Sequence, residues 1–204
     1  MAGTTKKSTR RRPQQRRAQQ TVDAVLDATV RLMKRKGFVS LTTNRIAEIA
    51  GVSIGSVYQY FPDKRAIFIA LHERHVAQID RVLAATLIEH AASPLDALIR
   101  AVVEAMIDAH TDDPELFELL QHEVPHRADS TQDFAVRLHG AFQLALSSRA
   151  QELGKVRDLD KAAFIVTHMV DSLAHGVVLR RPRGLSLKAA REEAVRAVLA
   201  YLHD

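Results

Sequence analysis

Side chains that can exchange hydrogen bonds with a polyanion are concentrated in residues 42–64, which read TTNRIAEIAGVSIGSVYQYFPDK. Their hydroxyl, amide, guanidinium and ammonium groups suit phosphate oxygens and the edges of bases. A glycine among them permits close approach of the backbone to a partner. The candidates are Thr42, Thr43, Asn44, Arg45, Ser53, Gly55, Ser56, Tyr58, Tyr60 and Lys64. The segment therefore predicts a nucleic-acid contact surface.

Two short helices joined by a tight turn are expected to position these groups. Thr42 and Thr43 can cap the first helix with a hydroxyl, and Gly51 follows it where a positive φ costs glycine least. Ser53 can cap the second helix, and Val57 at its centre is expected to face inward. A short helix rich in hydroxyls and small residues suits a groove of DNA better than a core.

Charge is divided unevenly along the chain. The net charge is +5 over 204 residues, but residues 1–65 hold 14 Lys/Arg against 4 Asp/Glu, and residues 66–204 hold 15 against 20. A basic third joined to an acidic remainder indicates a polyanion partner for one end only. Residues 1–16 are expected to be a disordered basic tail. Its arginines suit a phosphate backbone or minor groove, and a purely solubilising tail is the alternative.

Composition excludes several classes of protein. No uninterrupted run of 18 apolar residues occurs, so no membrane span or membrane partner is expected, and the basic N-terminus lacks the apolar region of a secretory signal. The absence of cysteine suits a cytoplasmic protein. A Gly-rich phosphate loop, a nucleophile elbow and a paired metal-ligand motif are all missing. We therefore expect neither an enzyme nor a cofactor.

Apolar residues recur at three- and four-residue steps through the rest of the chain, and no segment alternates with period two. The predicted fold is all-α, with about nine helices. Besides the pair described above, helices are expected at about 17–36, 64–90, 94–111, 114–122, 130–153, 158–180 and 186–203. The predicted domains are the tail 1–16, a helix-turn-helix domain 17–63, and a ligand-binding and dimerisation domain 64–204.

The segment 42–64 resembles the DNA-binding signature of TetR-type transcriptional regulators. The resemblance rests on Gly51 after the first helix, on the Tyr58-x-Tyr60-Phe61-x-x-Lys64 run, and on the amphipathic helix that precedes them. It implies a homodimer in which the first three helices bind a palindromic DNA operator. It further implies that the middle helices enclose a small-molecule effector. The helices near 158–180 and 186–203 would pair with their copies, and the usual role is a repressor released by the effector.

The resemblance also implies roles for single residues. Asn44 and Arg45 stand where the family reaches base edges or backbone, and a solvated Arg45 is the alternative. Phosphate contacts are implied for Thr42, Thr43, Tyr58, Tyr60 and Lys64, whereas Ser53, Gly55 and Ser56 open the recognition helix. Two simpler interpretations remain: the threonines serve only as a cap, and Tyr58 lies partly in the core.

A polar stripe marks the otherwise apolar helix 158–180. His168, Asp171, Ser172 and His175 share one face, and we favour a polar strip at the dimer interface over a pocket wall or a metal site. The full set of candidate effector contacts is Met106, His110, Phe117, Phe142, His168, Asp171 and His175. No metal ligand is assigned. A metal-responsive regulator and a sequence-blind architectural DNA-binding protein remain as alternative functions.

Overall fold

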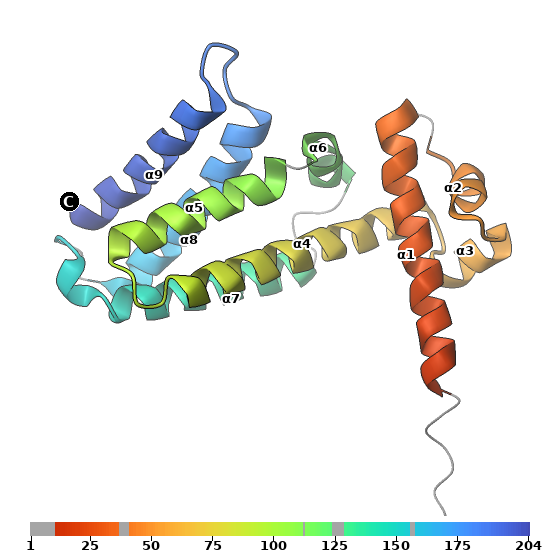
Figure 1. Cartoon of the computed structure of the whole chain (residues 1–204), viewed down its shortest axis with the longest axis horizontal. Helices are drawn as coiled ribbons and strands as arrows, with labels where there is room; N and C mark the ends of the chain where they lie inside the picture. The colour runs from red at the N-terminus through yellow and green to blue at the C-terminus, as the bar shows by residue number, and fades with distance from the viewer. Residues whose placement is uncertain (1–10, 37–40, 112, 124–128, 156–157) are drawn as a thin grey trace, which may run out of the picture. The chain divides into compact units, whose positions relative to one another are not determined.

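A computed structural model describes residues 11–36, 41–111, 113–123, 129–155 and 158–204. These residues form nine α-helices and one short 3-10 helix, with no strand among them (Figure 1). The all-α expectation is confirmed. In chain order the helices are α1 (Arg11–Lys36), α2 (Thr43–Ala50), α3 (Ile54–Tyr60), α4 (Lys64–Glu89), α5 (Leu95–Thr111), α6 (Pro114–Glu123), α7 (Asp129–Ser147), η2 (Ala150–Glu152), α8 (Leu159–Leu179) and α9 (Leu187–His203).

The chain divides into two compact units, of which the first ends at His72. In this unit α1 packs against both α2 and α3. Leu32, Ile46 and Val57 bring one fully buried apolar side chain from each of these helices. The first turns of α4 add Ile67 and Phe68, both buried. The first unit therefore includes the start of α4, and the functional boundary after residue 63 stays a prediction.

The first helix begins earlier than predicted. It starts at Arg11, so residues 11–16 are helical rather than part of a disordered tail. Arginine and glutamine are good helix formers, and Pro13 lies in the first turn, where its missing N–H would have no partner in any case. Residues 1–10, the rest of the predicted tail, lie outside the described residues.

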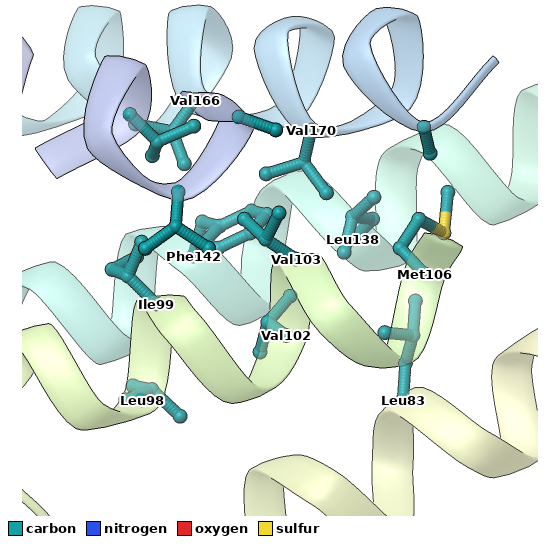
Figure 2. Close-up of a cluster of buried hydrophobic side chains, with 14 of the residues drawn as sticks. Leu83, Leu98, Ile99, Val102, Val103, Met106, Leu138, Phe142, Val166 and Val170 are labelled. Atoms are coloured by element: carbon teal, nitrogen blue, oxygen red, sulfur yellow. The ribbon is translucent and has the colours of Figure 1, made fainter. Parts of the chain in front are cut away.

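The second unit, from Glu73 onward, is built around a single apolar core. Helix α8 packs against α5, α7 and α9, and α5 also packs against α9. Figure 2 shows the centre of this core, where side chains from four helices converge. Those labelled there are Leu83, Leu98, Ile99, Val102, Val103, Met106, Leu138, Phe142, Val166 and Val170.

Capping residues set the bounds of the last two helices. The Asp158 carboxylate accepts the N–H of Lys161, and the Ser186 hydroxyl accepts the N–H of Ala189, each 3.1 Å away. Both helices agree with prediction to within about a residue. The single helix predicted over 130–153 is wrong: α7 begins at Asp129 and ends at Ser147, where hydroxyl bonds to main-chain carbonyls accompany the change to a 3-10 turn.

Helices α4 and α7 run parallel in a constant register. Arg137 of α7 pairs with Asp80 of α4, 57 residues earlier in the chain. Twelve residues further along, Arg149 donates to the carbonyls of His90 and Ala91, at offsets of 59 and 58. Two cross-links with nearly the same offset fix both the direction and the register of the two helices.

Length and composition alone would allow α8 to span a membrane, because an 18-residue window of it has a mean hydropathy of 1.5. Such a window is also typical of the central helix of a helical core. In this structure α8 packs against α5, α7 and α9, and 39% of that window is buried.

Candidate nucleic-acid interface and effector region

The turn between α2 and α3 is held by backbone hydrogen bonds. Gly51 has φ of 68°, the only positive φ in the part of the chain that the structure describes. Its N–H donates to the carbonyl of Glu48 at 3.2 Å, and the N–H of Val52 donates to Ala47 at 3.1 Å. These two hydrogen bonds form a Schellman motif, in which a residue in the left-handed conformation ends a helix. The predicted role of Gly51 is confirmed.

A serine cap and one buried valine hold α3 in place. The Ser53 hydroxyl accepts the N–H of Ser56 at 3.0 Å and lies 2.8 Å from its hydroxyl oxygen. Val57 is fully buried, whereas Ile54, Gly55 and the remainder of the outer face are exposed or half-buried. The helix therefore packs against the unit through Val57, and its other side chains are available to a partner.

Thr43 and Tyr58 connect the two helices at their surface. The threonine hydroxyl lies 3.2 Å from the tyrosine hydroxyl, within hydrogen-bond distance. Tyr58 is 52% exposed, so it is not a core residue. The pair links the Tyr58 side chain to α2 although about half of the residue remains exposed.

The other predicted DNA contacts also lie at the surface of the first unit. Thr42 caps α2 by accepting the N–H of Arg45 at 3.3 Å. The side chains of Asn44 and Arg45 are exposed, and Tyr60 and Lys64 are half-buried. None of the ten predicted positions is in the core, and their roles toward DNA stay predictions.

Four rings from four helices meet inside the second unit. His110 of α5 lies 4.2 Å from the Phe117 ring of α6, and His75 of α4 and His175 of α8 each have ring centroids 5.3 Å from that of His110. Phe117 and His175 stack at 4.8 Å with an interplanar angle of 21°. The structure therefore brings together three predicted effector contacts, His110, Phe117 and His175.

Burial controls the protonation of His110. Its side chain is 2% exposed, and its Nδ1 bonds to the Met106 carbonyl at 2.6 Å. Removal from water lowers the pKa of His110 to about 3, assisted by the nearby His75 and His175 rings. At neutral pH the centre of this ring cluster is therefore uncharged.

The remaining predicted effector contacts are dispersed. Met106 and Phe142 are each 1% exposed and belong to the apolar core. His168 is exposed and contacts Phe164 of its own helix, with ring centroids 4.2 Å apart and the rings tilted by 42°. Asp171 pairs with His175 at 3.5 Å. The polar stripe is therefore split: one end faces outward, and the other joins the ring cluster.

Sequence reasoning did not select His75 as an effector contact. It lies on the inward face of α4 and is half-buried, so the sequence does not distinguish it from an ordinary packing residue. Only the packing of α4 near α5 and α6 brings its ring to within 5.7 Å of Phe117. All ten histidines lie beyond residue 71, and this uneven distribution was the only sequence signal that could have pointed to His75 as an effector contact.

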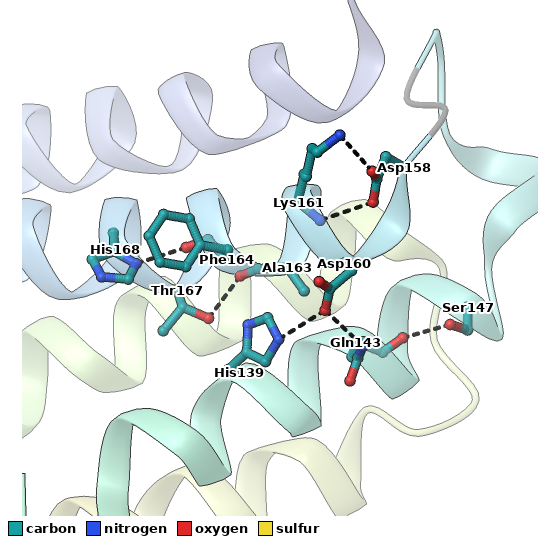
Figure 3. Close-up of polar contacts among 10 residues, drawn as sticks. All are labelled: His139, Gln143, Ser147, Asp158, Asp160, Lys161, Ala163, Phe164, Thr167 and His168. Carbon is teal, nitrogen blue, oxygen red and sulfur yellow. Dashed lines mark hydrogen bonds and ion pairs between the residues drawn. The ribbon is translucent and has the colours of Figure 1, made fainter. Parts of the chain in front are cut away.

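A polar network joins α7 to α8 near the start of α8 (Figure 3). Asp160 accepts a hydrogen bond from Gln143 at 2.8 Å and lies 3.2 Å from Nε2 of His139. The Asp160 side chain is exposed, whereas that of His139 is half-buried. Within the described ranges, no group of three or more His, Cys, Asp or Glu side chains could hold a metal ion. A metal-responsive site thus finds no support in that part of the chain.

The architecture and the exposed, capped α3 define a helix-turn-helix DNA-binding regulator. Residues 25–71 match the family described as bacterial regulatory proteins of the tetR family, and residues 94–202 match the tetracyclin repressor-like C-terminal domain. The chain belongs to the TetR family of transcriptional regulators. It is accordingly not an enzyme.

Individual relatives agree with this assignment. The HTH-type transcriptional regulator TtgR of Pseudomonas putida is 28% identical over 172 residues, which cover 76% of this chain and 79% of TtgR. The nucleoid occlusion factor SlmA of Haemophilus ducreyi is 40% identical over 70 residues, 34% of this chain and 30% of SlmA. The crystal structure of NalD, described as the secondary repressor of the MexAB-OprM multidrug efflux pump in Pseudomonas aeruginosa, shares the fold. Its TM-score is 0.64 at 18% identity, with coverage of 92% of this chain and 98% of NalD.

Proposed function

We propose that this regulator is a cytoplasmic repressor that binds a palindromic operator as a homodimer and leaves it when a small molecule binds. The observation that carries the proposal is the presentation of α3. This helix is capped by Ser53, anchored by Val57 and tied to α2 through Thr43 and Tyr58. A short helix so fixed can enter a major groove as a rigid body.

The proposed base contacts come from exposed side chains. Asn44 can pair with adenine and Arg45 with guanine through two hydrogen bonds each, and both side chains are exposed. Tyr58, Tyr60 and Lys64 would position the domain through phosphates. The excess of Lys/Arg over Asp/Glu in residues 1–65 adds sequence-independent attraction.

The proposed dimer interface uses α8 and α9. Phe164 is 53% exposed and Ile165 38% exposed on α8, although the opposite side of the same helix is core. A second copy would remove these side chains from water, as an interface between symmetric protomers requires. Two recognition helices could then enter successive major grooves about 34 Å apart on one face of DNA.

Effector binding is proposed to act through α4. This helix begins in the DNA-binding unit and continues into the second unit, so one continuous element belongs to both. A ligand that favours a different position of α4 would alter the spacing of the recognition helices and shift the population away from the DNA-bound form.

Selection of bound sequences from random DNA tests the operator proposal. We expect enrichment of one inverted repeat, protection of both half-sites in a footprint, and a dimeric mass in solution. Uniform protection without an enriched sequence would instead support an architectural role. A monomer that binds a single specific site with undiminished affinity would refute the dimer.

A further inference from the structure

A groove between α4 and α7 lies in the second unit, outside the ring cluster described above. It encloses about 370 Å³, near the lower end of the range for small-molecule sites and too little for a docked helix. Its lining residues are Asp80, Arg81, Leu83, Ala84, Leu87, Phe134, Arg137, Leu138 and Ala141.

Small side chains create this space. The 57-residue offset that joins Asp80 to Arg137 also places Ala84 opposite Ala141. Closely packed helices interdigitate larger side chains. Here the facing positions are too small to fill the gap between the two helices.

An ion pair marks one end of the groove. Arg137 of α7 pairs there with Asp80 of α4, and both residues line the groove. The lining on α4 continues to Leu87, seven residues further along, a rise of about 10 Å. Apart from the ion pair and Arg81, the lining side chains are apolar.

The groove has a charged end and an apolar body. Leu83 and Leu138 form a buried floor that continues into the core (Figure 2). The only charged lining groups are Asp80, Arg81 and Arg137, a net charge of +1. The Nε of Arg81 donates to the carbonyl of Ala77 at 3.2 Å, which holds the start of its guanidinium against the helix.

We propose that this groove binds an amphipathic molecule with a single negative charge. The head group would accept hydrogen bonds from the guanidinium groups of Arg81 and Arg137, which are suited to carboxylate. The apolar body would lie over Leu83, Ala84 and Leu138, where it displaces water from apolar surface. As an effector site, the groove rests on the proposed function, because the ligand would act by separating α4 from α7.

Calorimetric titration with decanoate, below its micelle concentration and without DNA, tests the site. Decanol and decyltrimethylammonium supply the neutral and cationic comparisons. We expect decanoate to bind about tenfold or more tightly than decanol, since it alone can form charge-assisted bonds with the arginines. Equal affinity for the three probes, or no binding of decanoate, would overturn the proposal.

Substitutions that fill the groove locate the ligand. Ala84→Leu and Ala141→Leu should each abolish decanoate binding. Their matched controls are Ala85→Leu on α4 and Ala135→Leu on α7, both at exposed positions that do not line the groove. Binding that survives both filling substitutions would place the ligand elsewhere.

Operator binding separates this inference from the proposed function. Wild-type protein that selects an operator but does not bind decanoate refutes the groove site alone. Protein that binds decanoate in the groove but selects no DNA sequence refutes the operator proposal alone.

Discussion

The hydroxyl oxygens of Thr43 and Tyr58 lie 3.2 Å apart and link α2 to α3 at the surface of the DNA-binding unit. Tyr58→Phe removes this bond and the proposed phosphate contact together. We expect the free energy of unfolding to change by less than about 1 kcal/mol, because the bond is exposed. Operator affinity should fall about threefold to tenfold. Electrophoretic mobility shifts measure the affinity, with Tyr201→Phe in α9 as the control. An unchanged affinity would remove Tyr58 from the contact surface.

Replacing Gly51 or Gly55 with alanine should change the stability of the protein in opposite directions. Gly51→Ala should cost about 1–2 kcal/mol of stability, because alanine is strained at a left-handed φ. Gly55→Ala should preserve stability or raise it by up to about 1 kcal/mol, because its φ is not positive and the nearest atom to a new Cβ lies 3.8 Å away. Chemical denaturation measures both.

The Gly55 variant also tests DNA approach. If the backbone at this position comes close to DNA, Gly55→Ala should weaken operator binding although the domain remains folded. Full affinity in a stable Gly55→Ala protein would contradict the predicted role of this glycine.

Arg149, two residues beyond the end of α7, should contribute far more to stability than the arginines within α4 and α7. It is 9% exposed and donates to the carbonyls of His90, Ala91 and Ser93. Arg149→Met leaves these acceptors without their donor, so we expect a loss of about 3 kcal/mol in calorimetric or denaturant unfolding. Arg137→Met is the matched control and should cost less than about 1 kcal/mol, because that ion pair is partly exposed, with 52% of the Arg137 side chain in contact with solvent. Equal losses in the two variants would contradict this account.

His110 should make stability depend on pH in the acidic range. Burial lowers the pKa of His110 from 6.5 to about 3, so the unfolded chain binds a proton that the folded chain does not. Stability is therefore fully present above pH 6.5 and declines as the pH falls toward 3, by at most about 1.4 kcal/mol per pH unit.

The difference between wild type and His110→Leu isolates this contribution from other titrating groups. Between pH 6.5 and about pH 4.5, the free energy of unfolding of His110→Leu should fall less steeply than that of the wild type. His203→Leu serves as the control, because His203 is exposed in the folded protein. Parallel pH profiles for wild type and His110→Leu would show that folding does not suppress the protonation of His110.

The basic start of α1 should contribute contacts with DNA phosphates. Arg16 and Arg17 are exposed, and no acidic residue occurs in the first turn to balance the helix dipole. Arg16→Gln and Arg17→Gln should each reduce the slope of log affinity against log salt by about 0.9 if one phosphate contact is lost. Arg31→Gln, exposed on the same helix, should leave the slope unchanged. If the salt dependence of operator affinity is the same in all three variants, Arg16 and Arg17 do not contact DNA phosphates.

Local signals in the sequence were sufficient for the helix-turn-helix. Gly51 and Ser53 each act through residues within five positions of themselves, and the apolar Val57 is the expected inward position of its short helix. Capping and periodicity also located α8 and α9, whose ends depend on Asp158 and Ser186. The early start of α1 was missed because polar residues form a helix there without an apolar stripe to reveal it.

Tertiary relationships were beyond the reach of the sequence pattern. His75, His110, Phe117 and His175 belong to four different helices, and no spacing rule predicts that their rings meet. The groove is a similar case. Alanines are unremarkable along a helix, and Ala141 becomes informative only when the register of α4 and α7 is known.

The shared register of α4 and α7 limits which length changes the protein can tolerate. Deleting one residue of α7 between Arg137 and Arg149 would turn the following part of that helix by about 100° and shorten it by about 1.5 Å. The two arginines could then no longer reach Asp80 and Ala91 at once. The number of residues between the two arginines is therefore constrained by these two cross-links, whereas side-chain size along the groove wall is constrained by the proposed ligand.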